Sequence, residues 1–412
     1  DESFRRWRIL YKQAEDTIQK AREGMDNPAI QQNSPKMIEL KRQHNIALSQ
    51  RSILLNALGQ TYGSESEFYI FRYLAAEGFL PGYNFTRLPI RVFVGHKEKQ
   101  QGEYIARPRF IALKEFGPNN IIYHNGNKYR ISRMMLTDVS LNTTKIKVSK
   151  ETGYAFLREE TDFYNNDPIT LRELNSQTNS NFWANLIELS ESEAIPQERI
   201  SSEEEERTSQ GFEIEQYFSY PKGIQSTEQA TIKAGGQPIL NVIYCPATRL
   251  IQVNHRWQRS KDAQGFLIDD RNGRWLRQKD LENPDINEHA REVRLFTTDT
   301  ADSIYIQPVK ELGLSKEQVV SLAFALKRAI ERHFEAEEDE IGVWIMGKKE
   351  EPNILIYEAS EGTLGILSQL VSGSTPLQNI FRKAYSLLHF NPETKEDTRP
   401  DLPRASYYDL LS

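Results

Sequence analysis

Aromatic and arginine side chains alternate in one short stretch of the sequence. Residues 79–89 read Phe-Leu-Pro-Gly-Tyr-Asn-Phe-Thr-Arg-Leu-Pro, and Arg107-Pro108-Arg109-Phe110 follows with the same residue types. Aromatic rings stack on bases and arginines neutralise phosphates, which is how many proteins bind single-stranded nucleic acid. The same residues could equally form an ordered corner of a core, and that second interpretation stays open. The nucleic-acid interpretation gives these candidate DNA-binding residues: Tyr83, Phe85, Arg87, Arg91, Arg107, Arg109, Lys128, Arg130 and Arg133.

A weaker signal of the same kind occurs further along the chain. Asn254-His255-Arg256-Trp257-Gln258-Arg259 also places arginines beside an aromatic ring, and the stretch from Arg271 to Arg277 is rich in arginine. We therefore take Arg256, Trp257 and Arg259 as a second candidate DNA-binding patch.

The sequence contains no complete catalytic motif. Nothing matches the phosphate-binding pattern G-x-x-x-x-G-K-[ST], so this chain has no P-loop with which to hydrolyse ATP. The seven histidines show neither H-x-x-x-H nor H-E-x-x-H spacing. Cys245 lies between Tyr244 and Pro246 in an apolar stretch, which is typical of a buried small side chain. We predict no catalytic residue, no metal site and no cofactor.

One acidic run leaves an enzymatic alternative open. Residues 335–340 hold five carboxylates, which usually form a solvated surface. A metal-dependent nuclease needs carboxylates near a lysine, and Asp339, Glu340 and Lys348 are loosely compatible with that arrangement.

Composition indicates a polar globular protein with an uneven charge distribution. The chain has 412 residues, 38% hydrophobic and 27% charged, which is enough for two or three domains. Residues 1–150 hold 24 Lys and Arg against 14 Asp and Glu, a net charge of +10, whereas the total is -6. A basic region beside an acidic one suggests a surface for a polyanion.

The same composition predicts a cytoplasmic protein without a membrane segment. The single cysteine permits no internal disulfide, which fits a reducing compartment. No apolar run approaches the ~18 residues that a membrane helix needs. Because the chain begins with Asp1 and not Met, we expect it to be part of a longer polypeptide.

Apolar periodicity and turn residues predict the elements that hold the candidate residues. Apolar steps of three and four predict a helix over 3–22, a second from Pro35 to about Leu58 that completes a helical hairpin, and a third from Ser64 to Gly78. Alternating or β-branched runs then predict a small antiparallel sheet or open barrel with strands at 88–94, 109–113, 120–124, 128–134 and 144–148. Asn125-Gly126 predicts a type I′ hairpin turn.

The rest of the chain predicts a mixed α/β region behind a polar segment. Residues 151–210 are the most polar, and we expect an exposed helix or mobile linker there. Strands follow at 211–220, 239–246, 248–254, 265–268, 291–297, 303–307, 342–346 and 353–358, with helices at 316–334, 363–370 and 375–388. The predicted fold class is α+β, with domains at 1–78 (helical hairpin and third helix), 79–150 (basic β domain), 151–210 (acidic linker) and 211–412 (mixed α/β).

Several stretches together resemble a known family. The stretches that carry this similarity are Tyr73-Leu74-Ala75-Ala76-Glu77 through Leu88-Pro89, Arg107 to Phe110, Glu115 to Asn119 and Ile122-Tyr123-His124. They are similar to the C-terminal region of large prokaryotic superfamily-two DEAD/DEAH-type helicases of anti-phage defence systems such as DISARM and Druantia. An acidic signature at 198–207 agrees in order. The stretches 304–308, 323–329, 354–358 and 361–365 resemble the helicase-associated domain shared with the zinc-binding tail of MrfA-type helicases.

This resemblance implies an accessory role beside a helicase motor. Zinc-bearing relatives carry four cysteines at the end of the domain, one pair in a segment like residues 405–412, and this chain has none there. A zinc role is therefore not carried over. The motor itself is not in this chain, so the resemblance places ATPase activity elsewhere in the polypeptide or in a partner.

The leading hypothesis is a non-catalytic accessory region of a defence-system helicase in prokaryotes. It would bind or guide DNA, single-stranded or forked, and would dock the ATPase motor or another subunit of the defence system. The first alternative is a protein-interaction scaffold that never touches DNA and uses the stripe of Trp7, Tyr11 and Ile18 as its contact. The second alternative is the metal-dependent nuclease.

Overall fold

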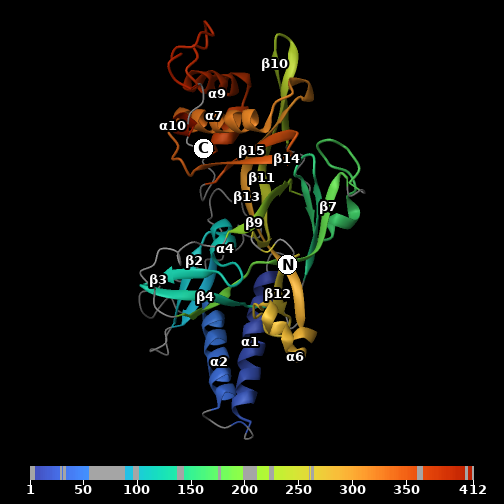
Figure 1. The fold of residues 1–412 in the computed structure, drawn as a ribbon, viewed down its shortest axis with the longest axis vertical. Helices are drawn as coiled ribbons and strands as arrows, with labels where there is room; N and C mark the ends of the chain where they lie inside the picture. Colours follow the sequence, from blue (N-terminus) through green and yellow to red (C-terminus); the bar gives the residue numbers. More distant parts are fainter. Residues whose placement is uncertain are drawn as a thin grey trace.

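The fold is described here from a computed structural model of the chain. It describes residues 5–27, 30, 34–54, 89–95, 102–136, 143–174, 178–197, 211–221, 227–258, 260, 264–359, 365–403 and 407–410. The third helix predicted over 64–78 and the aromatic stretch 79–87 lie outside these residues. The predicted α+β class is confirmed, since the chain forms separate helical and sheet regions (Figure 1).

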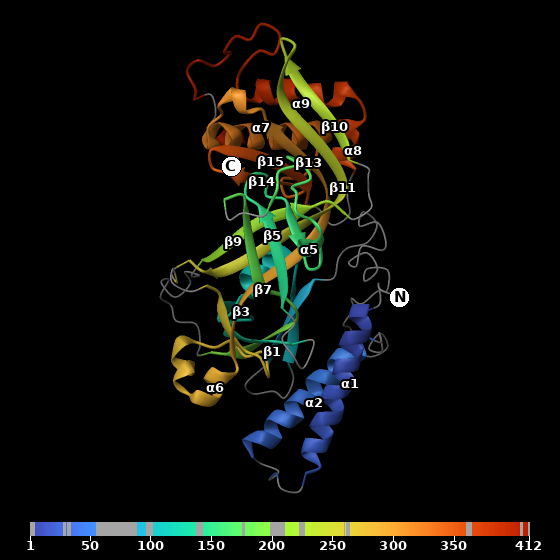
Figure 2. The same ribbon diagram turned by 90° about the vertical axis from the view of Figure 1, so that its right-hand side faces the viewer.

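A helical hairpin extends from one end of the molecule in both views (Figures 1 and 2). It consists of α1 (Arg5–Met25) and α2 (Pro35–Leu54), at the predicted positions. The apolar stripe of α1 is buried at Ala14, Ile18 and Ala21 and packs within the hairpin. Burial of Ile18 at 5% exposure removes this residue from the contact surface that the scaffold alternative assigned to it.

The small predicted sheet exists, with a different membership. Among the described residues its strand order is β2-β1-β8-β4-β3. Its strands are β1 (Ile90–Gly95), β2 (Gly102–Arg107), β3 (Ile121–His124), β4 (Asn127–Met134) and β8 (Ser192–Pro196). The predicted turn at Asn125-Gly126 joins β3 to β4, and both residues have the positive φ that a type I′ turn requires, 46° and 73°.

The strand predicted at 109–113 is wrong, because this segment is a helix. α4 (Arg109–Glu115) begins after Pro108 and buries Arg109, Ala112 and Leu113, with Phe116 following at 0% exposure. The buried positions 109, 112, 113 and 116 follow one another at steps of three, one and three residues. This spacing is typical of one face of a helix, whereas the buried side chains of a strand recur at every second residue. α4 packs against the small sheet and against β13.

The expectation of an exposed helix or linker is also wrong for residues 151–197. They form β6 (Ala155–Leu157), α5 (Glu160–Phe163), β7 (Ser180–Glu188) and β8. Apolar residues such as Phe156, Leu186 and Leu189 are buried here, and so are several polar ones, among them Asp167 and Glu193, so polar composition does not mark this segment as a linker. Residues 198–210, which include most of the glutamate run, lie outside the described residues.

A second, larger sheet runs through the centre of the molecule in the order β10-β11-β13-β7-β5-β6, with β9 on β11, β12 on β13 and β15 between β13 and β14. Its strands are β5 (Thr144–Ser149), β6, β7, β9 (Phe212–Ser219), β10 (Glu228–Ala234), β11 (Gln237–Trp257), β12 (Phe266–Asp269), β13 (Ala290–Pro308), β14 (Ile341–Lys348) and β15 (Glu351–Glu358). The strand predicted at 144–148 therefore belongs to this sheet and not to the small one.

Two of these strands were each predicted as a pair of shorter ones. β11 continues through Pro246 and Ala247 because a bulge between Cys245 and Thr248 absorbs both residues, and Ala247 takes a positive φ of 53°. β13 likewise runs unbroken from 290 to 308. Both strands reach from the small sheet to the C-terminal helices and join the two regions.

Helices cover the far end of the large sheet, where α7 packs against β14 and β15 and α9 packs on α7 (Figure 1). They are α7 (Lys316–Phe334), α8 (Ile366–Val371), α9 (Ser374–Leu387) and α10 (Tyr407–Leu410), with the 3-10 turn η4 (Lys310–Leu312) before α7. The short helix α6 (Pro284–Glu288) and the 3-10 turn η3 (Gln278–Glu282) lie at the opposite end, nearer the helical hairpin in both views. Ser315 caps α7, since its side chain and that of Gln318 form a capping box. No helix in the described part of the chain is long and apolar enough to span a bilayer.

Candidate nucleic-acid interface

The predicted DNA-binding residues fall into three groups by their position in the structure. Tyr83, Phe85, Arg87 and Arg259 lie outside the described residues. Arg91 and Lys128 lie half-buried on β1 and β4. The third group consists of residues whose neighbours are identified: Arg107, Arg109, Arg130, Arg133, Arg256 and Trp257.

Two of the predicted arginines form ion pairs. Arg107 Nε lies 2.8 Å from Glu115 Oε2 at the end of α4. Arg109 is only 8% exposed, and its Nη1 lies 3.5 Å from Glu188 Oε1 and 3.4 Å from the carbonyl oxygen of Thr298. Its side chain joins α4 to β7 and β13, so its place in the structure is internal.

The second candidate patch is also engaged in structural contacts. Arg256 Nε lies 2.7 Å from Glu213 Oε2 on the neighbouring strand β9. The Trp257 ring packs on Phe212 with ring centroids 4.0 Å apart. These contacts close the end of β11 over the core of the small sheet.

Arg130 and Arg133 come together with the stretch after β12. β3 covers only residues 127–130 of β4, and residues 273–275 occupy the edge of β4 beyond that point. The Met134 amide donates to Gly273 O and the Trp275 amide donates to Ser132 O, both at 2.9 Å. Arg133 and Arg274 become directly opposed residues across this bridge.

Three arginines from these two segments then lie within electrostatic range of one another. Burial lowers the pKa of Arg130, and the nearby positive charges of Arg277 and Arg274 lower that pKa further, while Asp280 raises it. Arg130 Nη1 donates to Asn119 Oδ1 at 2.9 Å. We call Arg130, Arg274 and Arg277 the arginine cluster.

The arginine cluster carries more positive charge than its surroundings neutralise. Asp280 is the carboxylate beside it, 3.7 Å from Arg274 Nη2, and Arg274 is still 52% exposed. Arg277 is exposed, and no described residue forms an ion pair with its guanidinium. The cluster therefore keeps a positive charge that an anion could neutralise.

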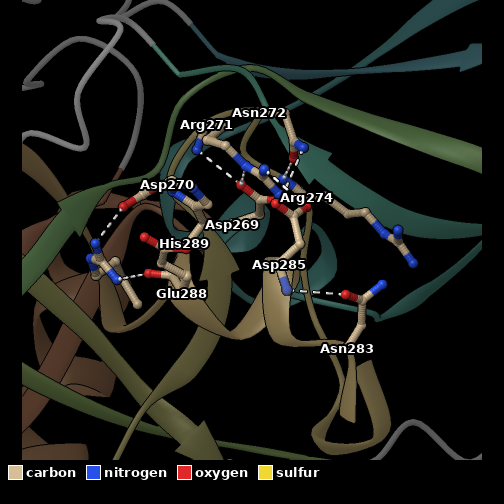
Figure 3. Close-up of polar contacts among 10 residues, drawn as sticks. Asp269, Asp270, Arg271, Asn272, Arg274, Asn283, Asp285, Glu288 and His289 are labelled. Atoms are coloured by element: carbon tan, nitrogen blue, oxygen red, sulfur yellow. Dashed lines mark hydrogen bonds and ion pairs between the residues drawn. The ribbon is translucent and has the colours of Figure 1, made fainter. Parts of the chain in front are cut away.

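A tightly bonded loop holds Arg274 in this position (Figure 3). Asp269 is 3% exposed and accepts hydrogen bonds from Arg271 N, Nε and Nη2 at 3.0 to 3.1 Å. Burial alone would raise the pKa of Asp269, but the Arg271 hydrogen bonds lower it. The Arg274 amide donates to Asn272 Oδ1 at 2.9 Å, and in Figure 3 the Arg274 side chain points away from the carboxylates of Asp269 and Asp285. The Arg271 side chain therefore stabilises the loop, whereas the Arg274 side chain faces outward.

The sequence analysis found the residues of the arginine cluster but did not predict that they lie together. Arg130 and the 271–277 stretch were separate candidates, more than 130 residues apart. The bridge between β4 and residues 273–275 brings them together. One local signal of the turn in this bridge is the dipeptide Asn272-Gly273, because Asn and Gly are both typical of turns.

Of the residues of the nuclease alternative, Asp339 and Glu340 lie between α7 and β14, whereas Lys348 is the last residue of β14, at the other end of the strand. The Glu337 amide donates to Glu340 Oε2 at 2.8 Å, which closes a short turn. Within the described ranges, no three His, Cys, Asp or Glu side chains gather as metal ligands.

Comparisons with known proteins give limited information. No family model matches the sequence, and no curated protein is similar to it. Among solved structures, the chain is similar to "DUF1998 helicase MrfA bound to DNA", with a TM-score of 0.36 and 8% identity over 87% of this chain and 40% of that one. The structure titled "DUF1998 helicase MrfA" gives 0.32 and 9% over 96% and 45%. This chain thus spans less than half the length of these proteins, and similarity at this level does not establish a shared fold.

Proposed function

We propose that this chain is a non-catalytic accessory region of a DNA helicase assembly, which contacts the DNA backbone through the arginine cluster. The helicase context comes from the sequence resemblance described above. Contact with DNA is inferred from the residues themselves. Docking of the ATPase motor and membership of a defence system belong to the same proposal.

The observation that carries the DNA contact is the gathering of Arg130, Arg274 and Arg277 from two distant segments. Burial lowers the pKa of Arg130, and the like charges of Arg277 and Arg274 lower it further, because positive charges held together disfavour the charged state of each side chain. A bound anion would offset the repulsion among these three arginine side chains, and the phosphates of DNA are anions at regular spacing. Arg107 and Arg109 are left out, because Glu115 and Glu188 already balance them.

The experiment replaces the two exposed members of the cluster. The variant Arg274→Gln with Arg277→Gln removes both charges but leaves Arg130 and its bond to Asn119 in place. Arg382→Gln, an exposed arginine of α9 near Glu393, is the matched control. Binding of labelled single-stranded and duplex oligonucleotides is measured at two salt concentrations.

The expected result is weaker binding with a smaller dependence on salt. Each lost phosphate contact reduces the salt slope by ~0.7 for a single strand and ~0.9 for a duplex. The double variant should therefore lose about 1.4 of the single-strand slope, whereas the control should keep it. Unchanged affinity and slope in the double variant would remove the DNA-binding proposal. Incubation of the same preparation with Mg²⁺ or Mn²⁺ tests the nuclease alternative, and we expect no cleavage.

A further inference from the structure

Exposed aromatic rings gather in a lobe away from the arginine cluster. The four most exposed large hydrophobic side chains among the described residues are Phe163 at 76%, Leu171 at 74%, Phe182 at 54% and Tyr164 at 49%. All four come from a stretch of 20 residues around α5 and the start of β7, beside β5 (Figure 2). Single exposed hydrophobic residues are common, but a group of this size in one segment indicates an interaction surface.

Tyr164 is already one layer of an aromatic stack. Its ring lies parallel to Phe156, with centroids 5.4 Å apart and an interplanar angle of 14°. Phe156 is only 6% exposed, whereas Tyr164 is half exposed. One face of the Tyr164 ring is therefore covered by Phe156 and the other is open for a further flat ring.

Phe182 lies on the same side of the sheet. Lys147 of β5 is directly opposed to Phe156 of β6 and to Phe182 of β7. Opposed residues on neighbouring strands project to one face, so Phe156, Lys147 and Phe182 form a row across three strands. Tyr164 covers one end of this row.

The short helix that precedes Tyr164 is held firmly in place. Glu160 is buried, accepts a hydrogen bond from the Leu157 amide at 3.3 Å and lies 3.5 Å from Arg249 Nη1. Thr161 Oγ1 donates to Arg158 O at 2.7 Å. Because these residues fix α5 on the sheet, Phe163 is kept exposed by a rigid element and not by a loose loop.

A positive charge lies between the rings. Lys147 Nζ donates to Tyr164 O at 3.0 Å and to Asn165 Oδ1 at 3.1 Å, and both acceptors are neutral. No described carboxylate forms an ion pair with this ammonium group. Its charge is therefore available to a phosphate beside the row of rings.

We propose that Phe163, Tyr164 and Phe182 form a stacking platform for the bases of single-stranded nucleic acid, with Lys147 beside the backbone. The platform has no residue in common with the arginine cluster, so this inference goes beyond the proposed function. Base stacking on aromatic side chains next to cations is how single strands are held without sequence preference. A protein partner would favour a continuous apolar surface, whereas here a lysine separates the rings.

The test compares a normal strand with one that cannot stack. Fluorescence anisotropy measures binding of a labelled oligo-dT and of an abasic oligonucleotide of equal length and charge to the full chain. Each stacked base contributes ~1 kcal/mol or more, about fivefold in affinity, so we expect the wild type to prefer oligo-dT by about tenfold or more. Phe163→Ala with Phe182→Ala should lose most of this preference. The control Leu312→Ala with Leu402→Ala removes two exposed leucines elsewhere and should keep it.

The outcomes separate this inference from the proposed function. Arg274→Gln with Arg277→Gln should weaken binding of both oligonucleotides equally and leave their ratio unchanged. If the wild type binds both oligonucleotides equally, or the phenylalanine variant retains the preference, the platform does not exist. Self-association of the wild type that the phenylalanine variant abolishes, with an unchanged oligonucleotide ratio, would show a protein contact instead and would also overturn the inference.

Discussion

Gly273 gives the sharpest test of how the arginine cluster is built. This residue is buried, has a φ of 71° and connects the Asp269 loop to β4. A Cβ atom at this position would lie 2.0 Å from the carbonyl oxygen of Met134, which is backbone and cannot rotate away. Gly273→Ala must therefore push residues 273–275 off the edge of β4.

The cost follows from two separate effects. A left-handed conformation costs a residue with a Cβ about 1 to 2 kcal/mol. Relief of the clash stretches the hydrogen bond from the Met134 amide to Gly273 O, which is 2.9 Å long, at about 1 kcal/mol more. The sum is about 2 to 3 kcal/mol, which corresponds to roughly a 30- to 150-fold change in a local opening equilibrium.

Hydrogen exchange at the Trp275 and Met134 amides measures this opening directly. We expect both amides to lose protection by that factor in Gly273→Ala, together with part of the DNA affinity, because Arg274 moves with the loop. Gly235→Ala is the control, since Gly235 also has a positive φ but nothing lies within 4 Å of its added Cβ. Only the conformational cost applies there. Equal losses of protection around the two glycines would refute the proposed docking of residues 273–275 on β4.

Three further predictions concern the scaffold. Burial raises the pKa of the Cys245 thiol to about 11, so at pH 8 only roughly one thiol in a thousand is ionised; a thiol reagent should label the protein only after denaturation. Ser315→Ala removes the capping box with Gln318 and should weaken the first turn of α7 by about 1 kcal/mol, seen as faster amide exchange there. Glu358→Ala leaves the Gly365 and Leu367 amides at the start of α8 without their buried acceptor. We expect amide exchange in α8 to lose about 2 to 3 kcal/mol of protection, and unchanged exchange would contradict this role of Glu358.

Elements whose signals are local were predicted well from the sequence. The turn at Asn125-Gly126 needs only two residues that tolerate positive φ, and both have it. The helix at 316–334 has a cap, a wide apolar face and a stop, and its observed bounds agree with the prediction. In each case the deciding interactions lie within a few residues of one another.

Errors occurred where the deciding contact was distant. Phe110 to Leu113 form a short apolar run, which suggests a strand, but α4 packs against β13 far along the chain and buries Ala112, Leu113 and Phe116. β8 was not predicted, because it lies in a glutamate-rich segment. The residues that the strand buries are Ser192, Glu193 and Ala194, and only the last of them is apolar. The strand pairs in parallel with β1. Composition averages over exposed and buried positions and so cannot separate a linker from a strand with one polar face.

The candidate site shows the same limit for charge. Counting residues gives the first 150 a net charge of +10, but Arg109 balances Glu188 and Arg107 balances Glu115. Arg274 and Arg277 come from the half of the chain with an acidic total, yet beside Arg130 they keep positive charge that Asp280, 3.7 Å from Arg274 Nη2, offsets only in part. The ion pairs that the fold forms decide where positive charge remains on the surface. The net charge summed over a segment of sequence does not show this.

One strand fixes the distance between the arginine cluster and the stacking platform. β13 pairs with β12 through Ala290 and Asp269, and the loop that presents Arg274 begins at that point. A few residues later, β13 pairs with β7 through Arg294 and Leu186, and β7 carries Phe182 at its other end. Both surfaces are therefore attached to a single continuous strand and not to separate loops.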